Sequence, residues 1–200
     1  FLRQQKKKVD VSHYFSLSDF IASEESAKTD YIGGFAVSAG FEVGSYADDV
    51  AKKGDDYRSI IVKALADRIA EATAEYLHHF VRGQWGIKEN LSIQEMIDEK
   101  YQGVRPAFGY PACPDHTEKQ MLWDLLSVEE NIGAQLTDTF AMNPPCSVSG
   151  LYFAHPQSQY FMVGKIQRDQ IQEYARRKGI TTEQAERWLS THLAYDPEVR

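Results

Sequence analysis

Cysteine is scarce in this sequence, and no apolar run approaches the length needed to cross a bilayer. Cys113 and Cys146 are the two cysteines in 200 residues, too few for the disulfide framework of a small secreted domain. The first ten residues, FLRQQKKKVD, are basic but lack the hydrophobic stretch of a signal peptide. We therefore expect a protein of a reducing, cytoplasmic compartment with no membrane partner.

Positive charge is also in short supply. The chain has 22 Lys and Arg against 29 Asp and Glu, which gives a net charge of −7. This balance offers no electrostatic footprint for a phosphate backbone, so we expect no nucleic-acid partner. The sequence also has no Gly-x-Gly-x-x-Gly after a strand-like run and no P-loop, which excludes the Rossmann-type and Walker-type phosphate cradles.

Apolar residues, in contrast, are plentiful enough for the core of one or at most two domains, at 42% of the chain. The longest helical pattern runs from about Tyr57 to Val81. Apolar residues recur there at three- and four-residue steps and form one stripe of Ile61, Leu65, Ile69, Ala72, Tyr76 and Phe80. Three shorter helices are indicated by capping-box pairs. These pairs are Ser92 with Glu95, Thr117 with Gln120, and Thr181 with Gln184.

Several β-rich runs accompany these helices. Residues 29–43 form one that is broken by glycines, which predicts a strand with a bend or a close backbone approach. Three more runs, at 135–143, 147–155 and 159–166, are separated by short spacers and predict an antiparallel meander. Because strands and helices do not alternate as βαβ units, we predict the α+β class, with a largely antiparallel twisted sheet flanked by helices.

The loop at residues 103–116, GVRPAFGYPACPDH, is the most informative segment. Its three prolines stiffen it, and its glycines let the backbone approach a flat ligand. Arg105 carries five N–H donors that suit a carboxylate, and Tyr110 adds a ring and a hydroxyl. A structural loop, in which Arg105 caps a helix or pairs with an acid, is about as well supported by composition alone.

The segment RPAFGYPACPDHTEK resembles the hallmark of the activation domain of cobalamin-dependent methionine synthases, in which Arg-x-x-x-Gly-Tyr-Pro forms an S-adenosylmethionine site. The resemblance continues through DYIGGFAVSAG, ENLSIQEMIDEKYQG and DLLSVEENIGAQLTDTFAMNPPCSVSGLYFAHPQSQYF, in the order of the family. It covers nearly the whole chain. We therefore expect residues 1–200 to be a single domain, the C-terminal part of such a module.

The resemblance implies a role for a set of residues around that loop. Arg105 would hold the methionyl carboxylate of the ligand. The adenosine part would be lined, largely by backbone atoms, by Ala107, Gly109 and Tyr110. Tyr160 would supply a hydroxyl, with Phe161 beside it; many members have a second tyrosine at the position of Phe161, so a hydroxyl contact there is lost.

Two acidic residues, Glu71 and Glu99, fall at positions that face the substrate and corrin region in this family. Glu71 also lies off the apolar stripe, four residues before Glu75, so a solvated polar helix face remains open for it. Glu99 is open to a similar interpretation as an exposed helix end.

The function implied is a repair step in methionine synthase, a methyltransferase of methionine biosynthesis. The domain would bind S-adenosylmethionine and present its methyl group to cob(I)alamin, with an electron from a flavodoxin-type reductase. Such a domain acts by positioning and needs no catalytic base. The Asp-x-His-x-x-Gly signature of cobalamin binding is absent, so cobalamin would come on the neighbouring domain of the full enzyme. The isolated piece would have no turnover alone.

Two other functions remain open at this stage. The chain begins with Phe1 instead of Met, and the first part of the family's module, which supplies an acidic partner for the ligand's amino group, is absent. The piece could therefore be a docking module for the cobalamin domain or the reductase. A small zinc or thiol hydrolase would instead use Cys113, His116, Cys146 and His155.

Overall fold

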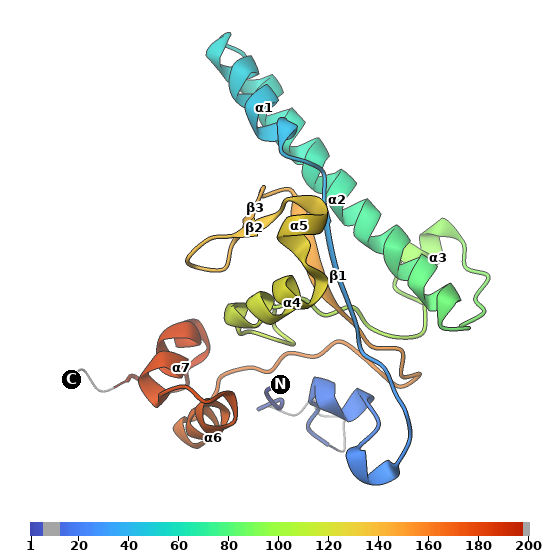
Figure 1. The fold of residues 1–200 in the computed structure, drawn as a ribbon, viewed down its shortest axis with the longest axis vertical. Helices are drawn as coiled ribbons and strands as arrows, with labels where there is room; N and C mark the ends of the chain where they lie inside the picture. The colour runs from blue at the N-terminus through green and yellow to red at the C-terminus, as the bar shows by residue number, and fades with distance from the viewer. Residues whose placement is uncertain (6–12, 198–200) are drawn as a thin grey trace.

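The computed structural model describes residues 1–5 and 13–197, so part of the basic N-terminal stretch lies outside the described residues (Figure 1). The α-helices are α1 (Glu42–Lys52), α2 (Asp56–Gln84), α3 (Ile93–Ile97), α4 (Lys119–Leu126), α5 (Val128–Ile132), α6 (Arg168–Lys178) and α7 (Thr182–Trp188). Short 3-10 helices are η1 (Leu17–Phe20), η2 (Glu24–Ser26), η3 (His116–Glu118) and η4 (Ser190–His192). The strands are β1 (Gly33–Ser38), β2 (Gln135–Leu136), β3 (Met142–Asn143) and β4 (Ser147–Tyr152).

The predicted α+β class and the antiparallel pairing are confirmed. Strand β1 pairs with β4, with Phe35 opposite Gly150, and β2 pairs with β3. Helix α2 packs on one face of β1–β4 and α4 on the other (Figure 1). Alternate residues of β1 serve the two faces, as the pleat requires: the Phe35 ring stacks on Tyr152 beside α2, and Gly34 faces Leu122 of α4.

The predicted meander is wrong in two respects. Strand β4 pairs with β1, which lies more than a hundred residues earlier, and not with β3. The third run, residues 159–166, is extended but forms no strand; it makes single contacts with loop backbone, such as Val163 N–H to the Pro111 carbonyl at 2.8 Å. Its burial alternation resembles that of a strand because Phe161 and Val163 enter the core while Met162 stays exposed.

The long helix is confirmed and extends to Asp56–Gln84, but the face it buries against α1 and the sheet carries small and polar residues instead of its apolar stripe. The buried positions are Ser59, Ala66, Ala70, Ala74, His78 and Arg82. Leu65 is 58% exposed and Tyr76 is 71% exposed. Small side chains let the helix lie close to β1–β4, where the rings of Phe35 and Tyr152 already fill the space. Among the described helices, none is both long and apolar enough to span a membrane.

The capping predictions have mixed outcomes. Both side-chain contacts of the box at Ser92 with Glu95 form, and so do those of Thr181 with Gln184. The box predicted at Thr117 is wrong. Asp115 instead accepts the hydrogen bond from the Thr117 N–H and caps the short helix that leads into α4.

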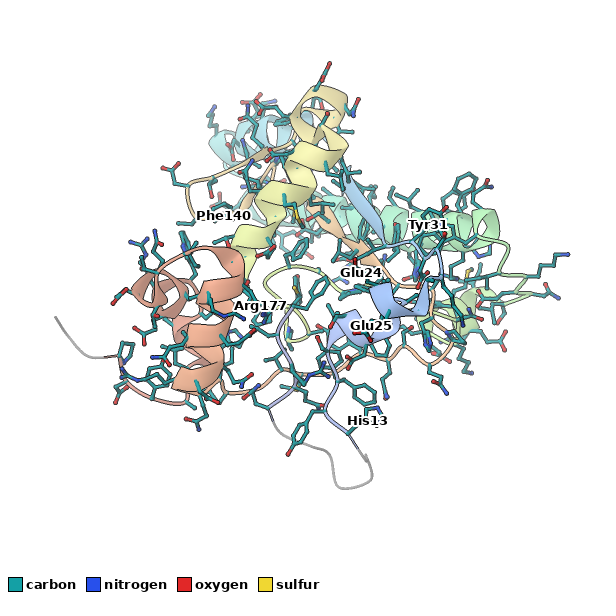
Figure 2. All side chains as sticks on the ribbon, turned by 60° about the horizontal axis from the view of Figure 1, so that its bottom comes forward. His13, Glu24, Glu25, Tyr31, Phe140 and Arg177 are labelled. Atoms are coloured by element: carbon teal, nitrogen blue, oxygen red, sulfur yellow. The ribbon has the colours of Figure 1, made fainter. Side chains whose placement is uncertain are left out.

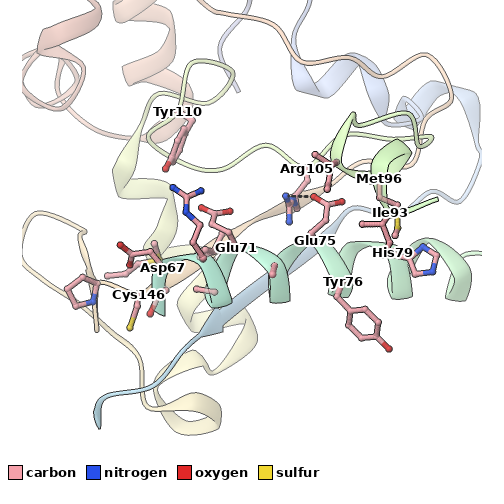
Figure 3. A pocket seen from close by; sticks show the side chains of 18 residues that line it. Asp67, Glu71, Glu75, Tyr76, His79, Ile93, Met96, Arg105, Tyr110 and Cys146 are labelled. Carbon is pink, nitrogen blue, oxygen red and sulfur yellow. Dashed lines mark hydrogen bonds and ion pairs between the residues drawn. The ribbon is translucent and has the colours of Figure 1, made fainter. Parts of the chain in front are cut away.

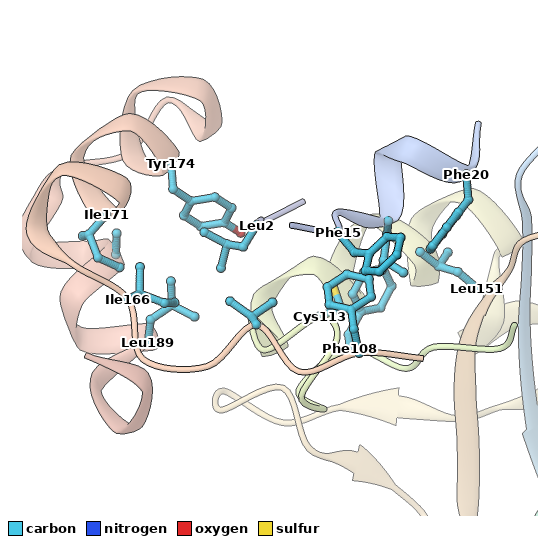
Figure 4. Packing of buried hydrophobic residues seen from close by; sticks show 14 of the residues in the cluster. Leu2, Phe15, Phe20, Phe108, Cys113, Leu151, Ile166, Ile171, Tyr174 and Leu189 are labelled. Carbon is cyan, nitrogen blue, oxygen red and sulfur yellow. The ribbon is translucent and has the colours of Figure 1, made fainter. Parts of the chain in front are cut away.

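The largest hydrophobic cluster lies away from α2 and joins the N-terminal segment, the 103–116 loop and the two C-terminal helices (Figure 4). Phe108 and Cys113 of the loop, 1% and 6% exposed, enter this cluster beside Phe15 and Leu151. The loop is therefore held from below by the core. Arg105, Ala107 and Tyr110 of the loop stay partly or largely exposed.

Candidate functional site

A cavity of about 460 Å³ lies above this loop. Five of the eight predicted site residues line it, and they are Glu71, Arg105, Ala107, Tyr110 and Tyr160. Its floor and far wall come from β1, β4 and the β2–β3 hairpin. A wider hollow of about 980 Å³ shares Glu71, Arg105 and Tyr110 and extends the site along α2. Figure 3 shows Glu71 and Glu75 on α2 facing the segment that carries Arg105 and Tyr110.

Backbone hydrogen bonds fix the shape of the loop. The Gly109 N–H donates to the Cys113 carbonyl at 2.8 Å, and the Cys113 N–H donates to Tyr110 at 2.9 Å, which closes a tight turn. The Leu151 N–H donates to the Pro106 carbonyl at 2.9 Å, so the loop runs along the edge of β4. Since proline also restricts φ, the chain holds this geometry before any ligand arrives.

Gly109 is required by the turn in two ways. Its φ of +90° lies in a region that side chains disfavour. A Cβ at this position would also lie 2.0 Å from Cε1 of His116, whose ring fills the space beneath the glycine. Its neighbours Phe108 and Tyr110 both line the cavity.

Arg105 forms an ion pair with Glu75 of α2, with Nη2 2.9 Å from Oε2. The sequence left this pairing open as the structural alternative, and it is present. The guanidinium is not saturated by it, because Nη1 has no hydrogen-bond partner among the described residues. Arg105 also lies 5.9 Å from the ring of Phe35 and borders the cavity. The side chain is thus held in place with donor capacity remaining.

Beneath Arg105 the polar groups of α2 are deeply buried. His78 stacks on Tyr152 at 4.8 Å, and burial, aided by Arg82 and Arg105, lowers the pKa of His78 to about 3. His78 is therefore neutral at physiological pH. Arg82 pairs with Glu89 at 2.9 Å and so keeps its charge balanced inside the fold.

The remaining predicted residues lie around the cavity at different distances. Tyr160 is 43% exposed at its mouth, and partial burial raises the pKa of its hydroxyl. Phe161 is 3% exposed, packs 6.1 Å from the ring of Phe15, and belongs to the core. Glu99 has a left-handed φ of 54° and lines a separate hollow of about 300 Å³ together with Arg105 and Tyr160.

Several residues that line the site were not among the predicted set, and Glu75, His116 and Lys119 are three of them. Lys119 is 5% exposed, and its Nζ lies 2.7 Å from Nδ1 of His116. The spacing of Glu71 and Glu75, one turn apart on α2, was visible in the sequence. Its meaning was missed, because the partner of Glu75 lies thirty residues away.

The zinc and thiol alternatives find no support at this site. Within residues 1–5 and 13–197, no group of three or more His, Cys, Asp or Glu side chains could hold a metal ion. Cys113 is buried, which raises the pKa of its thiol to about 12. A thiol with that pKa is not a nucleophile at neutral pH.

The fold and the cavity define an α+β domain with a proline-braced binding loop. Residues 1–179 match the family described as "Vitamin B12 dependent methionine synthase, activation domain". The chain therefore belongs to this family, as its resemblance implied.

A solved relative is the crystal structure of the MetH reactivation domain bound to AdoHcy (S-adenosylhomocysteine). It is 54% identical in sequence and superposes with a TM-score of 0.93 over 98% of the present chain. The present chain spans 61% of the length of that relative.

Proposed function

We propose that this chain binds S-adenosylmethionine in the cavity above the 103–116 loop and presents its methyl group for reactivation of a cobalamin-dependent methionine synthase. The observation that carries the proposal is Arg105, which lines the cavity, is anchored on Glu75, and has a buried Nη1 without a hydrogen-bond partner among the described residues. Membership of the activation-domain family and the AdoHcy bound to the solved relative support it. AdoHcy is the product that remains after S-adenosylmethionine gives up its methyl group.

Arg105 would hold the ligand carboxylate by a charge-assisted hydrogen bond. Glu75 would keep the guanidinium oriented from the opposite side. The adenosine part would lie against Ala107 and Tyr110, which line the cavity, and beside Gly109 between them.

Tyr160 would add a hydroxyl contact at the mouth of the cavity. Phe161 would support the site from the core side, since its ring is buried. Glu71 and Glu99 would face the corrin side of the ligand, Glu71 from the cavity wall and Glu99 from the neighbouring hollow.

The chemistry requires positioning more than proton transfer. The cobalt of a corrinoid, held by the neighbouring domain of the full enzyme, would accept the methyl group. The residues of this chain would fix the two ends of the ligand and so point the methyl group outward. Such positioning lowers the entropic cost of bringing the methyl group and the cobalt together in the reactive orientation. The partners would be the cobalamin-binding domain and a flavodoxin-type reductase that supplies the electron.

The setting of the chain follows from the same proposal. Residues 1–200 would form one domain, the C-terminal part of a longer module, in a cytoplasmic enzyme. The solved relative matches 98% of this chain, which supports a single domain. The two free cysteines support a reducing compartment.

Isothermal titration with AdoHcy tests the proposal directly. Arg105→Ala removes a charged hydrogen bond, which contributes about 1.5–3 kcal/mol, so affinity should fall roughly ten- to hundredfold. Arg176→Ala is the matched control, because Arg176 is 76% exposed and remote from the cavity. Equal affinity of Arg105→Ala and Arg176→Ala would show that the guanidinium does not hold the ligand.

A docking module without ligand binding is the second candidate. The ion pair between Arg105 and Glu75 favours it, because it occupies part of the guanidinium that would hold the ligand. Titration with AdoHcy, with and without an isolated cobalamin domain, separates the two. Heat from the domain but none from AdoHcy would leave docking as the function.

A further inference from the structure

Lys119 occupies an unusual environment at the edge of the cavity. It begins α4 and is 5% exposed, although lysine is among the residue types least often buried. Nζ contacts two neutral groups, Nδ1 of His116 at 2.7 Å and the carbonyl oxygen of Phe140 at 3.0 Å. No Asp or Glu of the described residues forms an ion pair with it, and burial lowers its pKa. A buried ammonium without a counter-charge is costly, and these two contacts are the hydrogen bonds that offset this cost.

One contact reaches the binding loop. The ring of His116 fills the space directly beneath Gly109, where a Cβ would lie 2.0 Å from Cε1. Lys119 fixes the orientation of that ring through Nδ1. The turn that carries Gly109 therefore rests on a ring that Lys119 holds.

The other contact reaches the opposite wall. Phe140 lies in the hairpin between β2 and β3, and its positive φ of 60° turns the chain there. The two residues that follow, Ala141 and Met142, line the cavity. Figure 2 marks Phe140 near the C-terminal helices, where its ring packs 5.2 Å from Trp188. The hairpin is thus tied to the rest of the fold at its tip.

We propose that Lys119 is a positioning residue of the ligand site, which sets the separation of the binding loop and the β2–β3 hairpin by bonding His116 on one side and the Phe140 carbonyl on the other. It touches neither the carboxylate nor the sulfonium end assigned to the ligand. This role rests on the proposed ligand site, whose two walls, the 103–116 loop and the β2–β3 hairpin, Lys119 holds at a fixed distance from each other.

Lys119→Met tests the proposal, since it keeps the length of the side chain and removes its charge and donors. Loss of two buried hydrogen bonds should weaken AdoHcy binding about tenfold at pH 7.5 in isothermal titration. Hydrogen exchange should rise at the amides of Thr137 and Phe140, which close the hairpin turn. Wild-type affinity together with unchanged exchange would overturn the proposal.

A pH profile distinguishes positioning from general loss of structure. Nδ1 of His116 can accept from Lys119 while the ring is neutral. Burial and Lys119 lower the pKa of His116 below 6.5, while Asp115 opposes this and His192 from η4 adds to it. As pH falls through that pKa, the ring gains a proton and repels the ammonium. Wild-type affinity should therefore drop, and Lys119→Met should not follow this drop.

Two further variants complete the test. His192→Gln removes the other histidine that faces His116 and should keep the wild-type profile; a flat profile in this variant would overturn the assignment. If Lys119→Met fails to fold, His116→Asn takes its place, because asparagine keeps an acceptor and cannot be protonated. It should bind without the acid-side drop, and a retained drop would count against the proposal. If the wild type binds no AdoHcy, the proposed function fails, and hairpin exchange alone then decides the role of Lys119.

Discussion

Substitution of Gly109 by alanine gives a test of the turn geometry whose size can be worked out in advance. A left-handed φ of +90° costs a residue with a Cβ about 1–2 kcal/mol. The new methyl group would also lie 2.0 Å from Cε1 of His116 and force the ring away. The ring then loses its contact with Lys119, a hydrogen bond to a charged group that contributes about 1.5–3 kcal/mol. The free energy of unfolding should fall by roughly 2.5–5 kcal/mol in total.

Gly164→Ala separates the two contributions. Gly164 has a similar φ of +84°, but a Cβ there meets no heavy atom within 4 Å. It should therefore show the backbone cost alone, about 1–2 kcal/mol. Urea unfolding followed by circular dichroism measures both variants. A difference of less than about 0.5 kcal/mol between them would mean that the His116 ring does not support Gly109, and the description of the turn would be wrong.

The remaining predictions concern the long helix and acid stability. Leu65→Ala should change the free energy of unfolding by less than about 0.5 kcal/mol because Leu65 is exposed. Ala74→Leu should lower the free energy of unfolding by about 1–3 kcal/mol, because it overpacks a buried position. The opposite ranking in urea unfolding would mean that α2 faces the sheet with its apolar stripe. Burial acts to raise the pKa of Asp115, but hydrogen bonds from Lys178, Tyr174 and a neighbouring threonine outweigh it and lower the pKa below 3.8. The contribution of Asp115 to stability is therefore present above the unfolded pKa and is lost as pH falls through the folded pKa. Asp115→Asn should accordingly lose less stability than the wild type between about pH 5 and pH 2. Equal losses of stability in the two proteins would refute this.

Local chemistry made several features predictable from the sequence. Prolines and glycines in residues 103–116 implied a rigid loop, and the structure has a hydrogen-bonded turn there with Gly109 at a left-handed φ. The periodicity between Tyr57 and Val81 implied a helix, and α2 is there. The family resemblance, carried by the same loop, is confirmed by the match over residues 1–179.

What the sequence could not provide depends on contacts between distant segments. Periodicity ranks side chains by hydrophobicity, so it missed the face of Ala66, Ala70 and Ala74, which is buried because it is small. The pairing of β1 with β4 spans more than a hundred residues, and short spacers wrongly favoured a meander. Glu75 showed only a like-charged neighbour within its own helix, while Arg105 lies thirty residues further on.

The cavity takes its walls from stretches of chain that unfolding would separate, among them β1, α2, the loop after Gly103, the β2–β3 hairpin and β4. A molecule that fills the cavity therefore binds the native form and has no equivalent site on the open chain. At a hundredfold excess over its dissociation constant, such a molecule adds about 2.7 kcal/mol to native stability. The melting temperature of the unlabelled protein can thus rank nucleoside analogues for this cavity without any corrinoid, reductase or enzymatic turnover.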